Sequence, residues 1–392
     1  MKKQTKQTRN TAQTGVISHQ IAPKSVYRTR QDIQKWNQAL NLARSVESPK
    51  HYPLQLLYNE IVIDALLSSQ LENRRLKSLS ASFTLTDSNG NANDKLTDLL
   101  QNKKWVNEIN KAIINSRFFG HSLIELSYKN GDLAVNLIPR TNVDPVNGLV
   151  IPDYQDDIKK IPYRDMSEYG TWILEFGENG DLGLLNSCVP HVLFKRFAQS
   201  CWSELCEIYG IPPRVMKTNT HDKSMVSRSE KMMRDMGAAA WFIIDSTEEF
   251  QFAQGVQTNG DVYRNLIQLC NNENSMVISG AIIGQDTVNG NRSKDESAQN
   301  MLQDLIESDL SLLEMEWTST VIPALVKLGI VPDGTRYAYD KAENLEELWT
   351  RTKETFAYYD VNMEWIKDKF GIEVEGKKQT GFNLNHPDSF FV

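Results

Sequence analysis

Apolar residues recur at three- and four-residue steps along the first half of the chain, and this spacing predicts helices over residues 25–45, 54–79 and 94–119. In the second of these helices, the polar run 72–75 is expected to be a solvated face. Alternating apolar and polar positions predict strands over residues 83–85, 123–128, 133–137 and 172–176. Asn130 and Gly131 join the middle two strands as a hairpin, because these residues supply the positive φ angles of a tight turn. The first half is therefore predicted to be mixed α+β.

Helical patterns dominate the second half. They predict helices over residues 191–209, 224–240, 294–328, 342–359 and 362–370, with a strand over 241–245. Ser293 and Glu296 have the spacing of a capping box at the start of the long helix. Pro323 is expected to kink that helix, because proline lacks a backbone donor and clashes with the preceding turn. Glycines at positions 280, 284 and 290 indicate a loop before it.

The helix predicted over 191–209 carries apolar residues on two faces. One stripe contains Phe194, Phe197, Cys201, Leu205 and Ile208, and a neighbouring stripe contains Trp202, Cys206 and Tyr209. Two apolar faces on one helix favour packing on more than one side, including against another subunit.

The charge of the chain is unevenly distributed. The net charge is −7, yet seven Lys and Arg residues and no acidic residue precede Asp32. A net acidic protein is not expected to grip DNA over a broad surface, because affinity for phosphates comes largely from Lys and Arg. Residues 1–24 are expected to be a disordered basic N-terminal arm. This arm is either a solvating tail or a segment that docks on an acidic partner or on nucleic acid. No apolar run reaches the length of a membrane span, and no signal peptide is expected.

Cys188, His191, Cys201 and Cys206 lie within nineteen residues and nominally form a zinc-binding set. Their spacing argues against zinc, because structural sites usually pair their ligands on tight knuckles. Cys201 and Cys206 are five residues apart on a predicted helix and therefore point in different directions. We expect buried, reduced thiols, no metal and no cofactor.

No catalytic motif is present in the sequence. A phosphate-binding loop, a nucleophile elbow and a His-Glu-x-x-His motif are all absent. Acidic residues do gather on the long helix, at Asp295, Glu296, Asp304, Glu307, Asp309, Glu314 and Glu316. Asp304, Glu307 and Glu314 are spaced to share one face, which is expected to be solvated or to face a pore. A metal-dependent nuclease or phosphotransferase that uses this helix over 295–316 is the enzymatic alternative.

The order of several motifs resembles the portal proteins of Mu-like tailed phages. These motifs are Leu193-Phe-Lys195, the run from Trp202 to Arg214, Tyr263 to Leu269, Asn274 to Gln285, Ser308 to Leu328, Val361 to Trp365, and Gly371-Ile372. The resemblance covers roughly residues 50–375. It implies no enzymatic activity, and an α+β, portal-like fold.

The resemblance implies a subunit of a dodecameric ring at one capsid vertex, through which double-stranded DNA is packaged and ejected. Its implied partners are terminase, the major capsid protein and head–tail connector proteins. The resemblance implies that the protein is part of the virion and is assembled in the host cytoplasm. It implies no membrane partner. The third alternative is a monomeric head–tail adaptor.

The resemblance also implies a division of the chain. A mixed α+β wing would span residues 25–189, paired stem helices 190–240 with a clip at 211–223, a wing return 241–282, a tunnel loop 283–293, a long kinked helix 294–330, and a small crown and tail 331–392. The residues implied to face DNA are Asp286, Thr287, Asn289, Asn291 and Arg292. Those implied to dock partners at the clip are Pro212, Pro213, Arg214 and Lys217, and those implied to pack the stem are Phe194, Phe197, Trp202 and Leu205.

Overall fold

The computed structural model describes residues 24–156, 158–210, 214–235, 241–248, 260–282, 292–339, 345–356, 358–359 and 361–372. The expected N-terminal arm and the C-terminal tail therefore lie almost entirely outside the described residues. The chain divides into two compact units, Met1–Tyr339 and Asp340–Val392. The second unit therefore begins later than the crown boundary expected at residue 331. No described helix is long and apolar enough to cross a lipid bilayer.

The first unit begins with helices α1 (Lys24–Ala43), α2 (Tyr52–Ile61), α3 (Ala65–Leu79), α4 (Asp94–Gln101) and α5 (Lys104–Phe119). The single helices predicted over 54–79 and 94–119 were wrong, because each is broken once. At the first break, the Asp64 side chain accepts a hydrogen bond from the backbone N–H of Leu67 and so caps α3. At the second break, Lys103 is extended, which ends α4 and starts α5.

A three-stranded antiparallel sheet follows, in the order β3-β2-β7. Its strands are β2 (Ser122–Lys129), β3 (Asp132–Leu137) and β7 (Ile173–Phe176). The hairpin predicted at Asn130 and Gly131 is confirmed, with φ angles of 54° and 82° at these two residues.

Two further small sheets complete the β-structure around the core. One contains β4 (Val143–Asp144), β5 (Leu149–Val150) and β6 (Ile161–Pro162), and the other pairs β1 (Phe83–Thr86) with β10 (Arg336–Tyr339). Short 3-10 turns at Arg140–Asn142 and Tyr163–Asp165 flank the first of these sheets. The pairing of β1 with β10 joins residues that lie far apart in the chain.

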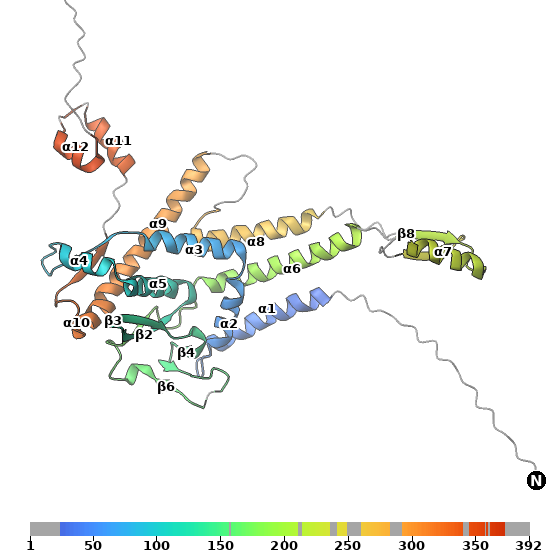
Figure 1. Ribbon diagram of the computed structural model, residues 1–392, viewed down its shortest axis with the longest axis horizontal. Coiled ribbons are helices and arrows are strands. Elements are labelled where there is room, and N and C mark those ends of the chain that lie inside the picture. Colours follow the sequence, from blue (N-terminus) through green and yellow to red (C-terminus); the bar gives the residue numbers. More distant parts are fainter. Residues whose placement is uncertain are drawn as a thin grey trace, which may run out of the picture. The chain divides into compact units, whose positions relative to one another are not determined.

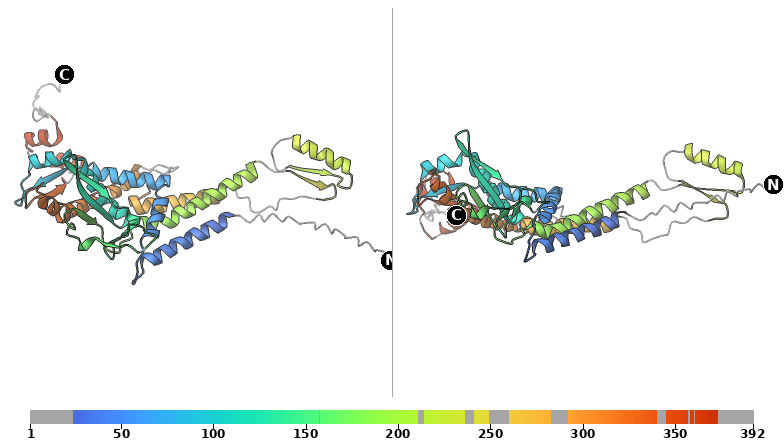
Figure 2. Two further views of the ribbon diagram at one scale, coloured as in Figure 1. Left: turned by 60° about the horizontal axis from the view of Figure 1, so that its bottom comes forward. Right: turned by 90° about the horizontal axis from the view of Figure 1, so that it is seen from below.

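Three long helices cross this unit, namely α6 (Leu185–Gly210), α8 (Asp261–Ser279) and α9 (Arg292–Glu316). Helix α6 starts before the predicted residue 191 and continues through Pro190. It packs along α8 on one side and along α1 on another (Figures 1 and 2). The indole of Trp36 on α1 donates a hydrogen bond of 3.1 Å to the Asn186 side chain on α6. Packing of α6 on more than one side is therefore confirmed within the chain itself.

The long helix changes its geometry before Pro323. After α9, the residues Trp317–Val321 form a wide π-helical turn, and α10 (Ile322–Lys327) follows. Pro323 has no N–H to donate to the preceding turn, which accounts for an irregularity at this place. The Trp317 ring stacks on Tyr337, and Tyr337 stacks on Phe83, with both pairs of ring centroids 4.6 Å apart. These rings fix the turn against the β1–β10 sheet.

The chain between α6 and α8 contains a small α/β element. Strand β8 (Arg214–Thr218) pairs in parallel with β9 (Trp241–Asp245), and α7 (Lys223–Asp235) packs on both. The strand predicted over 241–245 is confirmed. The helix predicted over 224–240 is confirmed as far as Asp235, and residues 236–240 lie outside the described residues.

The second unit contains α11 (Leu345–Thr355) and α12 (Met363–Phe370). Trp349 contacts Phe356 and Phe370, and Trp365 contacts Phe370, so these aromatic rings pack together, and Ile366 is buried among the described residues of this unit. The helix predicted over 362–370 is confirmed, with the Asn362 side chain capping its first turn.

Two buried histidines lie in the core of the first unit. His51 and His121 are each 2% exposed, and their rings meet edge to face with centroids 6.4 Å apart. None of their ring nitrogens has a hydrogen-bond partner. Burial, the Arg140 guanidinium and His51 lower the pKa of His121 to about 3. Burial also lowers the pKa of His51.

We therefore expect the fold to lose stability on acidification. An unfolded histidine has a pKa of about 6.5, whereas His121 in the folded chain has a pKa of about 3. Between these two pH values, the unfolded chain binds a proton at His121 and the folded chain does not, so protonation favours unfolding. The contribution of His121 is fully present above about pH 6.5 and should fall by about 2 kcal/mol between about pH 7 and about pH 5. Urea unfolding at both pH values measures this loss. In the His121→Gln variant, which cannot titrate, the pH dependence should be smaller by that amount, and an unchanged dependence would contradict the assignment.

Candidate functional site

Three helices converge on one buried carboxylate, that of Asp309. Asp309 lies on α9 and is 1% exposed. Arg74 on α3 donates to both of its oxygens, from Nε at 2.7 Å and from Nη2 at 2.8 Å. Arg117 on α5 donates to the same carboxylate at 2.9 Å. We call Arg74, Arg117 and Asp309 the arginine–aspartate cluster.

The cluster also reaches the end of α8. The remaining guanidinium nitrogen of Arg74, Nη1, donates to the backbone carbonyl of Ile278 at 2.7 Å. One turn earlier on α8, the Ser275 hydroxyl accepts a hydrogen bond from the Gln70 side chain on α3. A single arginine on α3 therefore holds both α8 and α9, the two helices that flank residues 283–291.

Because the cluster is buried, loss of either charged partner is costly. Arg74 is itself 1% exposed, so neither member of its bidentate pair can be hydrated. A buried charge that loses its partner is strongly destabilising, whereas a matched apolar replacement of both partners is tolerated. The Arg74 guanidinium also lies over the Phe118 ring, 5.6 Å from its centroid. The cluster therefore fixes the relative position of α3, α8 and α9.

Helices α8 and α9 meet beside Gly280. Gly280 has a φ of +71°, and a Cβ added there would lie 3.1 Å from the Leu305 side chain. Leu305 is thirteen residues into α9, so the helix continues about 20 Å beyond this contact to its first residue. The end of α8 therefore lies beside the middle of α9, about 20 Å along the helix axis from the first residue of α9.

The far end of α8 is held against α6. Gly260, with a φ of +81°, precedes α8, and a Cβ added there would lie 3.0 Å from Nε1 of Trp202 on α6. A side chain is therefore excluded at this position by both backbone conformation and space. Glycines at both ends of α8 allow its close approach to neighbouring helices.

The family resemblance implied a different pairing of helices. It paired residues 191–209 with 224–240, but α6 packs along α8, and α7 packs on β8 and β9. The reason is that the α7 region closes a small parallel sheet, which a helix must cover. The predicted stem residue Phe194 is 40% exposed, and Phe197, Trp202 and Leu205 are half-buried. The structure brings these four residues together on α6.

Most of the predicted DNA-facing and clip residues lie outside the described residues. These are Asp286, Thr287, Asn289, Asn291, Pro212 and Pro213. Arg292 is the first residue of α9, and Arg214 is the first residue of β8. Lys217 lies within β8 with its side chain exposed.

The acidic residues of α9 have two different environments. Asp304, Glu307 and Glu314 are exposed, as expected for a solvated or pore-facing stripe. Asp309 is instead buried and paired with two arginines. The expectation that residues 72–75 form a solvated face was wrong at Arg74, which is buried and paired with Asp309.

Sequence reasoning missed the arginine–aspartate cluster although the spacing contained a signal. Arg74 lies on the stripe of α3 that also contains Leu67 and Leu71. Asp309 lies on the stripe of α9 that contains Leu302, Ile306 and Leu313. Two opposite charges on the buried stripes of two helices indicate that they meet.

The four cysteine and histidine residues weighed as zinc ligands do not converge. Cys188 and Cys206 are separated by eighteen residues of the continuous helix α6, a distance of about 27 Å. Cys188 is buried, but Cys206 is exposed, so the expectation of buried thiols was wrong at Cys206.

Comparison with known proteins decides the family. A family model described as the portal protein of Mu bacteriophage matches residues 55–372, which is most of the chain. The chain belongs to this family. The resemblance noted in the sequence is thereby confirmed, and the function is that of a portal protein in the head–tail connector of a phage particle. Members of this family are structural proteins. None of the curated proteins matches the chain.

One solved structure shares the fold of this portal protein. It is a chain in the neck of a native GTA particle computed with C12 symmetry, with 13% sequence identity and a TM-score of 0.51, covering 86% of this chain and 98% of that chain. A chain in the neck of an empty GTA particle computed with C6 symmetry is also similar, with 12% identity and a TM-score of 0.48, covering 77% of this chain and 89% of that chain.

Breaking the arginine–aspartate cluster should destabilise the fold severely. We expect Arg74→Ala and Asp309→Ala each to lower the free energy of unfolding by about 3–5 kcal/mol, because each leaves a buried charge without its partner. The double variant Arg74→Met, Asp309→Leu should lose much less than the sum of the two single losses. Urea unfolding of the three variants measures these values.

Arg75 provides the matched control, because it is adjacent to Arg74 on α3 but pairs with Glu72, whose side chain is 47% exposed. Arg75→Ala should lower the free energy of unfolding by about 1 kcal/mol or less. Equal losses at the two arginines would contradict the structural role of the cluster.

Proposed function

We propose that copies of this portal protein assemble into a dodecameric ring at one vertex of a capsid. Double-stranded DNA is packaged and ejected through the channel of the ring, and terminase, the major capsid protein and head–tail connector proteins dock on it. The observation that carries this proposal is the family match over residues 55–372. The C12 symmetry of the neck structure with the same fold supports the stoichiometry.

The surface of the chain supports a ring. Helices α6, α8 and α9 leave large apolar side chains exposed, among them Phe194, Val262, Leu269, Met276 and Met301. In a cyclic assembly each copy uses two different faces, one toward each neighbour. Contiguous helices with apolar residues on outer faces meet this requirement, because burial against neighbours removes those residues from water.

The packing of α6 on α8 supports a revised division of the chain. We assign the stem to α6 and α8, and the clip to the β8–α7–β9 element in the chain between them. The tunnel loop is residues 283–291, and α9 to α10 is the long kinked helix. The mixed helices and sheets that precede α6 form the wing, and the crown begins at residue 340.

The charge of the chain supports a channel rather than a DNA-gripping surface. A lumen that lets DNA slide must not hold phosphates tightly, and the net charge is −7. The exposed Asp304, Glu307 and Glu314 on α9 agree with such a lumen. We assign contact with DNA to Asp286, Thr287, Asn289, Asn291 and Arg292, which are mostly polar and uncharged.

The purified chain should form rings with a central hole, with a mass of about twelve subunits. Negative-stain electron microscopy shows the hole, and mass photometry counts the subunits. A monomer in isolation and also in the presence of the capsid proteins would contradict the proposal and would favour an adaptor.

Truncation of residues 286–291 should leave the rings intact and impair DNA packaging or DNA retention, because the arginine–aspartate cluster holds α8 and α9 independently of the loop. Packaging is measured as nuclease-protected DNA per particle, and assembly as ring mass. The matched control is substitution of Ser88 and Asn89 by alanine in the exposed turn before α4, which should change neither. Loss of rings in the truncated variant would contradict the loop assignment.

A further inference from the structure

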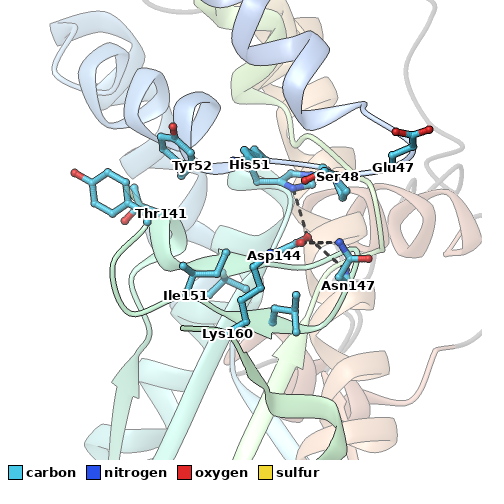
Figure 3. Close-up of a pocket in the computed structure, with 14 residues that line it drawn as sticks. Glu47, Ser48, His51, Tyr52, Thr141, Asp144, Asn147, Ile151 and Lys160 are labelled. Carbon is cyan, nitrogen blue, oxygen red and sulfur yellow. Dashed lines mark hydrogen bonds and ion pairs between the residues drawn. The ribbon is translucent and has the colours of Figure 1, made fainter. Parts of the chain in front are cut away.

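A cavity of about 100 Å³ lies beside the first turn of α2 (Figure 3). The segment after α1 forms one wall with Glu47, Ser48, His51 and Tyr52, and the β4–β5 region forms the other with Thr141, Asp144, Asn147, Ile151 and Tyr154. Lys50 and Lys160 also line it. None of the portal features described above uses this cavity.

The inner part of the cavity is acidic. Asp144 is 5% exposed, and its carboxylate accepts hydrogen bonds from the backbone N–H groups of Val146 and Asn147 and from the Asn147 side chain at 2.7 Å. All of these donors are neutral. Its ion-pair partner among the described residues is His51, with Nδ1 at 3.9 Å from Oδ1. Because burial lowers the pKa of His51, this partner is mostly neutral near pH 7 and does not balance the carboxylate charge.

His51 adds an unused hydrogen-bonding group. Its side chain is almost completely buried, it lines the cavity, and neither ring nitrogen has a hydrogen-bond partner. A neutral imidazole offers one donor and one acceptor, and leaving both unused in a buried place is unfavourable. The acceptor nitrogen fits a ligand that carries N–H groups.

Two aromatic side chains complete the lining of the cavity. The rings of Tyr52 and Tyr154 lie with centroids 5.3 Å apart, and aromatic rings attract cations. Val46 is 98% exposed and Ile158 is 87% exposed, so apolar residues lie next to the lining in sequence on both walls. Glu47 and Lys160 are exposed and can turn toward solvent. A buried carboxylate, an unpaired imidazole and two tyrosines together match an ammonium or guanidinium group.

We propose that this cavity receives a Lys or Arg side chain from residues 1–23 of a neighbouring copy in the ring. That segment contains Lys2, Lys3, Lys6 and Arg9 and no acidic residue. Its charge is complementary to the buried Asp144. The proposal rests on the ring assembly proposed above, and it gives the basic arm an acidic partner.

The geometry of α1 favours a neighbouring copy over the same chain. Residues 1–23 precede α1, whereas the cavity wall begins just after α1 ends. The twenty residues of α1 place these two points about 30 Å apart. To occupy its own cavity, the segment must return along the whole helix. Twenty-three residues span at most about 75 Å when fully extended, so the segment can reach a site well beyond the start of α1.

Photo-cross-linking in the full chain tests this inference. Tyr154 is replaced by p-benzoylphenylalanine, which keeps an aromatic ring in the cavity wall. Rings are assembled from an equal mixture of ¹⁴N- and ¹⁵N-labelled copies and irradiated, and the cross-linked peptides are identified by mass spectrometry. We expect cross-links to residues 1–23 that join peptides of different isotopic label. The same probe at Tyr128, an exposed residue on β2, is the control and should not capture this segment.

Variants that change the charge of the cavity or of residues 1–23 distinguish a cationic occupant from an anionic one. Asp144→Asn should lower the cross-link yield about tenfold, because it removes the buried charge that the cation neutralises. Lys160→Glu should raise the yield, and replacement of Lys2, Lys3, Lys6 and Arg9 by glutamine should abolish it. An unchanged or higher yield in Asp144→Asn would overturn the proposal, and a higher yield would indicate an anionic occupant. Cross-links within single copies would overturn the assignment to a neighbour.

Ring mass is measured on the same samples, so the two proposals fail in different ways. Intact rings without cross-links to residues 1–23 overturn this inference and leave the portal ring standing. Absence of rings overturns the proposed assembly and, with it, docking between copies.

Discussion

The described first unit depends on the salt bridge between Arg74 and Asp309. These two side chains join α3 to α9 in a place from which water is excluded, and Arg74 also holds the last turn of α8. A buried ion pair is poor evidence of net stability, because removal of two charges from water offsets much of their attraction. Its value is specificity, since a shift of either α3 or α9 along its neighbours breaks three hydrogen bonds at once. Under the proposed function, this constraint holds the helices on either side of residues 283–291 in fixed positions.

Local patterns in the sequence predicted the elements well where short-range chemistry decides them. The Asn130-Gly131 hairpin, the strand at Trp241–Asp245 and the Asn362-capped helix α12 each depend on residues close together in the chain. The family also followed from ordered motifs. Helix boundaries were less predictable, because the break between α2 and α3 depends on Asp64, whose carboxylate also binds the distant Lys195 ammonium at 2.8 Å. A helical stripe alone does not contain that information.

The candidate site was harder to predict because its key contacts join distant segments. Arg74 and Asp309 are separated by 235 positions, and Arg74 was interpreted as solvated when its own helix was considered alone. The pairing of α6 with α8 was missed for a related reason, since the intervening β8–α7–β9 element hides their adjacency in the sequence. His51 and Asp144 were not singled out, because one isolated histidine and one turn aspartate have no distinctive spacing. Their significance depends on burial, which the sequence pattern does not give.

The π-helical turn at Trp317–Val321 has a geometric consequence for both parts of the long helix. An α-helix turns each residue by about 100°, so its core-facing stripe is fixed in angular phase from end to end. The wider turn contains one additional residue and resets that phase, which allows the adjacent residues Val321 and Ile322 both to be buried. Asp309 can therefore face Arg74 while Ala324 and Leu325 independently face the core. The core-facing stripe of α10 therefore does not have to continue the stripe of α9 in the same angular phase.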